Sequence, residues 1–177
     1  MSLRSLSHLY PNAKAASEAF GEAIGSGRVP RRELCLCMKL MANEDGSNLQ
    51  QLTEGLLRAF GLEAFDVALL YLPATSAEQA VRVWAKMEQL ARLGLARSLG
   101  LSNHYDPAMI APLLRAERPP VINQVRRTHS SGARLQAWLH ARQPPLLHYS
   151  LQRAARFPAA RCSAVHPLLR SSCTRCS

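Results

Sequence analysis

The chain has 177 residues, of which 47% are hydrophobic and 19% charged, so it is long enough to bury one globular core and gives no sign of a second one. A formal net charge of +10 would suit a polyanionic partner, but the arginines are spread along the chain between apolar stretches, which predicts a solvated surface and no nucleic-acid partner. No apolar stretch approaches the roughly 18 residues that a membrane helix needs, and the polar start is unlike a secretory signal, so we expect a soluble cytoplasmic protein with no membrane partner.

The first predicted elements are a helix over Ala13–Ile24, stopped by Gly25 and Gly27, and a strand over Leu34–Met38 that ends at Lys39. An ammonium group that follows a buried strand is costly to place unless it pairs with another group or meets a ligand, which makes Lys39 a candidate functional residue. The alternative is a lysine whose side chain reaches solvent at the strand end.

Further strands are predicted where apolar residues run without a break, a pattern typical of strands covered on both faces. These runs are Phe65–Leu72, Arg97–Leu101, Val121–Val125 and Leu146–Tyr149. The segments between them have helical periodicity and end in recognisable caps. The expected helix starts are Ser47 with Gln50, Ser76 with Gln79, and Asp106 with Pro107, and a last helix contains Leu135, Trp138 and Leu139.

Strand-helix units of roughly 25–30 residues predict an α/β fold with parallel strands and crossover helices, either doubly wound or a barrel. We assign residues 1–150 to this unit. Leu151–Ser177 has five arginines, three cysteines and no acidic residue, so we expect a basic, disordered tail there. With five cysteines in all, an odd number, reduced thiols are expected rather than a disulfide framework.

Polar side chains stand at the ends of the predicted strands. In a parallel barrel these ends face one mouth, where substrates and cofactors bind. The residues at these ends are Lys39, Tyr71, Ser102, Asn103, Asn123, Gln124, His148, Tyr149 and Ser150. Metal binding is not expected, because Cys35 with Cys37 and Cys173 with Cys176 have no second pair at a matching separation.

Four segments resemble the aldo-keto reductase family. Arg32–Leu40 is similar to the family's strand that ends in its catalytic lysine, and Trp84–Leu90 with Gly94–Asn103 is similar to its most recognisable region. Pro120–Val125 and His148–Ser150 resemble the next two strands. The family is a (β/α)8 barrel that binds NADP(H) and reduces carbonyl groups. The resemblance implies a partial TIM barrel with strands 3 to 7 of the family, since a complete barrel uses about 250 residues and the first two strands would precede Met1.

The resemblance also implies roles for single residues. Ser102, Asn103 and Gln124 would hydrogen-bond the nicotinamide carboxamide of NADP(H), and Tyr149 would stack on the nicotinamide ring. Tyr10 resembles the catalytic tyrosine, which donates a proton as hydride reaches the carbonyl carbon of a small-molecule substrate. Lys39 would promote that donation.

Two catalytic positions of the family differ here. Ser5 stands where the family has its catalytic aspartate, and Tyr71 where it has its catalytic histidine. Tyr71 could still donate a hydrogen bond to the substrate oxygen, so binding is expected to survive better than turnover.

Three interpretations follow. The first is an NADP(H)-dependent oxidoreductase with impaired or absent turnover. The second is a non-catalytic regulatory subunit with a protein partner, similar to the modifier subunit of glutamate-cysteine ligase, which also keeps the Asn-Gln strand and lacks the histidine. The third is a gene-model remnant that does not fold.

Overall fold

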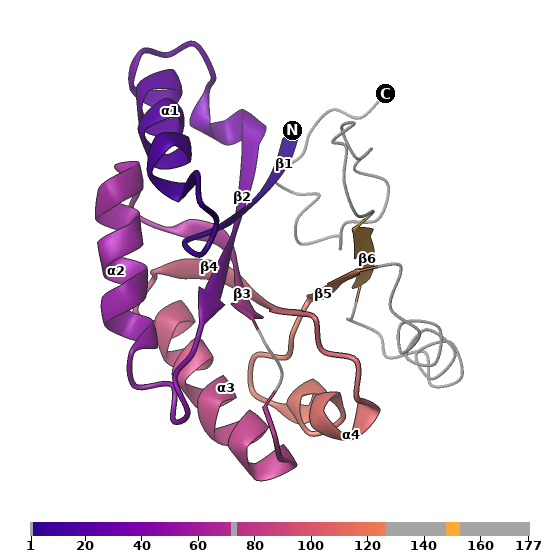
Figure 1. The fold of residues 1–177 in the computed structure, drawn as a ribbon. Helices are drawn as coiled ribbons and strands as arrows, with labels where there is room; N and C mark the ends of the chain where they lie inside the picture. The colour runs from indigo at the N-terminus through magenta and orange to yellow at the C-terminus, as the bar shows by residue number, and fades with distance from the viewer. Residues whose placement is uncertain (1, 72–73, 127–147, 153–177) are drawn as a thin grey trace.

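The structure is a computed structural model that describes the backbone of residues 2–71, 74–126 and 148–152, and the side chains of residues 4–71 and 74–125. Its centre is one sheet of six parallel strands that stand side by side in chain order (Figure 1). The strands are β1 (Ser2–Ser7), β2 (Leu34–Met41), β3 (Phe65–Tyr71), β4 (Ala96–Ser102), β5 (Ile122–Arg126) and β6 (His148–Gln152).

The longer helices lie along the same side of this sheet, as Figure 1 shows for α1, α2 and α3. The helices are α1 (Ala13–Gly25), α2 (Leu49–Phe60), α3 (Ala77–Arg92) and the single turn α4 (Pro107–Ile110), with 3-10 turns η1 (Arg31–Glu33) and η2 (Leu113–Arg115). In a doubly wound sheet the strand order reverses at a switch point, which places helices on both faces. When every right-handed crossover leads to the next strand in the same direction, all helices lie on one face of the sheet. The unreversed order therefore identifies part of a (β/α)8 barrel, the alternative that sequence spacing leaves open.

Strands β2 to β6 confirm the five predicted strands, with shifted ends. β2 runs on to Met41, so Lys39 lies inside the strand and not after it. β6 covers His148–Gln152 and extends two residues past the expected boundary at Ser150.

The expectation that the chain holds only strands 3 to 7 of the barrel is wrong, because Ser2–Ser7 forms a sixth strand, β1, which pairs in parallel with β2. The segment has no continuous apolar run, because Leu3 and Leu6 are its only apolar residues and two polar residues lie between them. Alternation places Leu6 against the core under the helices and leaves Ser5 and Ser7 on the other face.

The predicted helix start at Ser76 is confirmed, and the one at Ser47 is wrong. Ser76 caps α3 by accepting from the backbone N–H of Gln79 at 3.2 Å, and Gly61 ends α2 in the left-handed conformation with φ 62°. Ser47 does not cap α2, which begins after Asn48. Asn48 instead accepts from the backbone N–H of Asn43 and steadies the loop before the helix.

The helix predicted after Asp106 begins as expected, since the Asp106 carboxylate accepts from the N–H of Ala108 at 2.8 Å. It ends after one turn and continues as the separate 3-10 turn η2. The predicted helix with Leu135, Trp138 and Leu139, and the tail from residue 153, lie outside the described residues.

The core has two layers separated by the sheet, and β2 supplies both. Leu34 to Leu40 are all buried, and alternate side chains enter opposite layers. Leu36 and Met38 join the large cluster under the helices, while Cys35 and Cys37 join a small cluster on the inner face of the curl. The pKa of Cys37 is raised well above its ordinary value by the hydrogen bond with Cys35 and by burial, so this thiol stays protonated.

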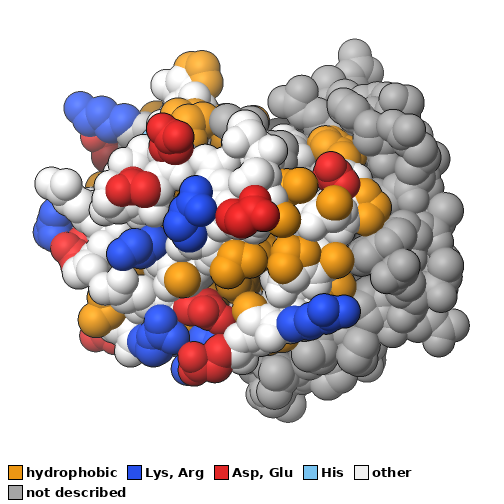
Figure 2. Space-filling view, turned by 90° about the horizontal axis from the view of Figure 1, so that it is seen from below, with side chains coloured by type: hydrophobic (Ala, Val, Ile, Leu, Met, Phe, Trp, Pro, Cys, Tyr) orange, Lys and Arg blue, Asp and Glu red, His pale blue; other side chains and the backbone are white. Residues whose placement is uncertain are grey.

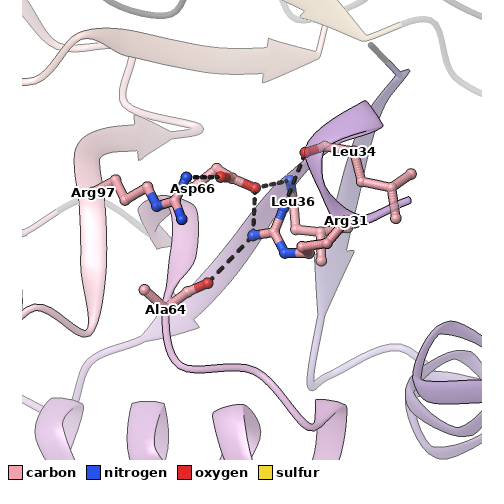
Figure 3. A network of polar contacts seen from close by, with 6 residues as sticks. All are labelled: Arg31, Leu34, Leu36, Ala64, Asp66 and Arg97. Carbon is pink, nitrogen blue, oxygen red and sulfur yellow. Dashed lines mark hydrogen bonds and ion pairs between the residues drawn. The ribbon is translucent and has the colours of Figure 1, made fainter. Parts of the chain in front are cut away.

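A buried carboxylate joins three strands at their amino ends (Figure 3). Asp66 Oδ2 accepts from the N–H of Leu36 at 2.8 Å and from the guanidinium of Arg31 at 2.7 Å. Its other oxygen lies 3.5 Å from the guanidinium of Arg97. Arg31 also donates to the carbonyl oxygens of Leu34 and Ala64, so these contacts link β2, β3 and β4 at the end opposite the predicted mouth.

Charges are mixed on the surface that Figure 2 shows, where acidic and basic side chains stand next to one another. The last acidic residue of the chain is Glu117, so all 12 acidic residues belong to the described part. In that part of the chain, no helix combines the length and apolarity needed to cross a membrane.

Candidate functional site

The carboxyl ends of the strands bring the predicted site residues to one edge of the sheet. Tyr71 on β3 is the register partner of Ser102 on β4, which is the partner of Gln124 on β5. Lys39 on β2 is paired with Leu69, two residues before Tyr71. Register partners, and residues two apart on a strand, share a face, so all of these side chains belong to the inner face of the curled sheet.

Tyr10 and Lys39 meet at this edge. The Lys39 ammonium nitrogen donates to the Tyr10 hydroxyl oxygen at 3.0 Å and lies 5.7 Å from the centre of the Tyr10 ring. Tyr10 follows β1 in a turn closed by its N–H bond to the carbonyl of Ser7. Lys39 is 4% exposed and Tyr10 is 42% exposed, so the phenol lies at the surface while the ammonium is held beneath it.

The end of β4 is tied to β5 through a strained residue. Asn103 has φ 60°, which is uncommon for a residue other than glycine, and its N–H donates to the carbonyl oxygen of Gln124 at 2.9 Å. Strain of this kind is held in place by surrounding contacts and is concentrated at functional sites. The preceding hydroxyl, Ser102 Oγ, is fully buried and has no hydrogen-bond partner among the described residues.

Gln124 is held by the opposite side of the curl. The hydroxyl of Ser5 on β1 donates to Gln124 Oε1 at 2.9 Å, and Gln124 is 4% exposed. Ser5 stands at the position where the resemblance places a catalytic aspartate, so in this chain that position contacts the candidate cofactor-binding glutamine.

His104 and Asn123 form a buried polar group behind the site, and of the two only Asn123 is among the strand-end residues that the sequence singles out. Asn123 donates to the carbonyl oxygen of His104 at 2.7 Å, and the His104 ring contacts the carbonyl oxygen of Ser102 at 3.2 Å. Burial lowers the pKa of His104 to about 4, so the imidazole is neutral. The available signal for His104 is its position directly after the Ser102-Asn103 pair.

The structure describes the side chain of Tyr71 but only the backbone of Tyr149. Tyr71 is half-buried at the end of β3, beside Ser102 in register. Tyr149 lies in β6 as the register partner of Asn123, and its side chain is outside the described part. Cys173 and Cys176 are also outside it, and no group of three potential metal ligands occurs among the described residues.

Comparison with known proteins gives one family. The sequence model of the aldo/keto reductase family matches residues 6–132. An aldo-keto reductase of Mycolicibacterium vanbaalenii is 32% identical over 108 residues, which cover 60% of this chain and 39% of the relative. The (1S)-1,7-diacetoxy-luvungin A aldo-keto reductase of Citrus sinensis is 31% identical over 134 residues, which cover 66% of this chain and 42% of the relative.

Solved structures agree. The crystal structure of an aldo-keto reductase of Bombyx mori in complex with NADP is similar with a TM-score of 0.67 and 26% identity, over 84% of this chain and 50% of that one. The chain spans about two fifths of the length of the curated relatives that it matches. Since the family match covers well over half of the chain and the strand order is that of a barrel, this chain belongs to the aldo/keto reductase family.

Proposed function

We propose that this chain binds the nicotinamide end of NADP(H) and belongs to an oxidoreductase that acts on a small carbonyl or alcohol substrate, with weak turnover. The observation that carries the proposal is the Tyr10–Lys39 pair, 3.0 Å between hydroxyl oxygen and ammonium nitrogen, beside the polar ends of β4 and β5. The Bombyx mori relative with NADP bound supports the choice of cofactor.

The residues present fit a carboxamide-bearing ring. A buried hydroxyl without a partner costs free energy, and Ser102 Oγ is such a group at the edge where the site residues converge. Beside it are the Asn103 amide and the Gln124 carboxamide, which together supply donors and acceptors. A nicotinamide carboxamide needs one acceptor and one donor, and this set provides both.

Tyr10 is suited to donate a proton. When bound, NADPH supplies the hydride for carbonyl reduction. The Tyr10 hydroxyl would give its proton to the substrate oxygen, and the Lys39 ammonium, already bonded to the Tyr10 oxygen, would stabilise the negative charge left there. The exposure of Tyr10 allows a substrate to reach this hydroxyl.

Weak turnover follows from the two replaced positions. The Ser5 hydroxyl contacts Gln124 and brings no carboxylate charge to the site. Tyr71 offers a phenol where the family has an imidazole. Each loss removes a preorganised polar group, and a single such group is worth about 10²–10³ in rate.

A titration of NADPH fluorescence against the purified chain tests binding. We expect saturable, submillimolar binding that Gln124→Ala weakens, and no change in Gln51→Ala, a matched change at an exposed position on α2. Indifference to Gln124→Ala, with the control also unchanged, would refute the site.

A second candidate is a non-catalytic regulatory subunit on the same scaffold, and the changes at Ser5 and Tyr71 favour it. The test adds the chain to the catalytic subunit of glutamate-cysteine ligase and, separately, to NADPH with a simple aldehyde. Turnover of the aldehyde that depends on Tyr10 supports the enzyme. Activation of the ligase without aldehyde turnover supports the regulatory subunit.

A further inference from the structure

We infer that Ser5 is a positioning residue for the nicotinamide site, because its hydroxyl holds Oε1 of the Gln124 carboxamide and leaves Nε2 for the ligand. The inference rests on the proposed function and deepens it. It assigns a role to a position that lacks the family's aspartate.

The contact between Ser5 and Gln124 follows from the geometry of a barrel. Successive register partners lead from Ser5 across β2 and β3 to Ser98 on β4. Gln124 is paired with Ser102, which lies four residues farther along β4. A complete eight-stranded barrel has a shear of about 8, so strands four apart face each other with a stagger of about four residues. The 2.9 Å bond therefore crosses the inside of the curl between opposite strands, β1 and β5.

This bond leaves one kind of group on Gln124 for a ligand. The carboxamide has an oxygen that accepts and an NH2 that donates. Because Ser5 donates to Oε1, the Nε2 donors are the atoms presented to a bound molecule, which matches the carbonyl oxygen of a nicotinamide carboxamide.

An aspartate at this position would act differently. A carboxylate only accepts, so it would engage Nε2 and turn Oε1 toward the ligand. A bound molecule would then need an N–H donor. Ser5 thus sets a preference for ligands that carry a carbonyl acceptor at this place on the ring.

Two reduced dinucleotides distinguish these arrangements. NADPH carries the full carboxamide, and the reduced 3-acetylpyridine analogue keeps the carbonyl oxygen but lacks the amide N–H. The quantity compared is the ratio of the two Kd values. We expect Ser5→Ala to weaken the binding of both by about fivefold, the value of one hydrogen bond, and to leave their ratio as it is in the unaltered chain. Ser5→Asp should shift the ratio in favour of NADPH, because Oε1 would then require a donor.

Three controls make the result specific. Ser5→Thr keeps the hydroxyl and should bind like the unaltered chain. Ser98→Ala removes a half-buried hydroxyl at the same level of the sheet and should change neither Kd. In a Gln124→Ala background, Ser5→Ala should cause no further loss.

Equal Kd values for the unaltered chain and a folded Ser5→Ala variant would overturn the inference. If Gln124→Ala alone weakens NADPH binding, the role of Ser5 fails while the proposed function stands. If the unaltered chain does not bind NADPH, both fail.

Discussion

The ammonium nitrogen of Lys39 lies 3.0 Å from the hydroxyl oxygen of Tyr10, and the two residues come from β2 and from the turn after β1. Lys39 is 4% exposed, so the charge is held in a place where water screens it little. Its effect on the neighbouring phenol is therefore stronger than that of a lysine at the surface.

Replacing Lys39 with methionine keeps the length of the side chain and removes the charge. We expect residual carbonyl reduction to fall by at least about 100-fold, because Tyr10 loses the group that stabilises its oxygen after proton transfer. Reduction of a simple aldehyde, followed by loss of NADPH absorbance, measures this effect. Lys14→Met on α1, where the side chain is exposed, should leave the rate unchanged. An equal loss in both variants would contradict a catalytic role for Lys39.

Asp66 is expected to be important for stability and not for binding. Asp66→Asn removes the charge that faces Arg31 and Arg97, and leaves Arg31 partly buried without it. We expect the free energy of unfolding to drop by about 2–3 kcal/mol, below the value for fully buried pairs because Arg97 is largely exposed. Urea denaturation measures the drop. Glu117→Gln, which breaks an exposed pair with Arg92, should cost less than about 1 kcal/mol.

Gly100 on β4 has no room for a side chain. A Cβ atom there would lie 2.7 Å from side-chain carbons of both Leu69 and Ile122, and 2.8 Å from the Ile122 carbonyl oxygen. Gly100→Ala should therefore destabilise the protein by about 1–3 kcal/mol, through overpacking between β3, β4 and β5. Gly55→Ala in the middle of α2 should stabilise it by about 0.5–1 kcal/mol, because the new Cβ meets only Arg58, at 3.9 Å. The same sign of change in both variants would contradict this account.

His104 should make stability depend on pH. In the folded protein the pKa of His104 is about 4, below its ordinary value of 6.5, so the unfolded chain takes up a proton first as the pH falls. The free energy of unfolding should decrease from about pH 6.5 to about pH 4 and stop responding to His104 below that. Between pH 7 and pH 5 the expected loss is about 2 kcal/mol.

Urea denaturation of the unaltered chain and of His104→Gln, at both pH values, isolates this contribution. The variant lacks the titrating group, so its stability should change less over the same interval. Parallel pH profiles for the two proteins would show that His104 does not bind the proton responsible.

The sequence was informative where burial is complete. The continuous apolar runs of β2 and β3 predicted both strands, because each is covered by helices on one face and by the inner cluster on the other. The strand Ser2–Ser7 was missed for the opposite reason, since it contains only two apolar residues, Leu3 and Leu6, and the rule for buried strands does not apply to it. Helix caps were predicted well at Ser76 and wrongly at Ser47, where a side-chain bond from Asn43 competes.

In the candidate site, too, some features follow from the sequence and others do not. Motif positions led to Lys39, Ser102 and Gln124, because parallel strands in regular order place their ends together. The Ser5–Gln124 bond could not be predicted, because it depends on the stagger between opposite strands, which periodicity along one strand does not contain. The burial of His104 depends likewise on how the loop after β4 turns inward.

Because each described strand after β1 pairs with the strand synthesised just before it, each of these units finds its partner already formed. Among the six strands that the structure describes, none has to wait for a distant segment, so the ordering entropy is lost in small steps. Such a chain can assemble from its amino end while the ribosome is still extending it, with the edge for the next strand always available.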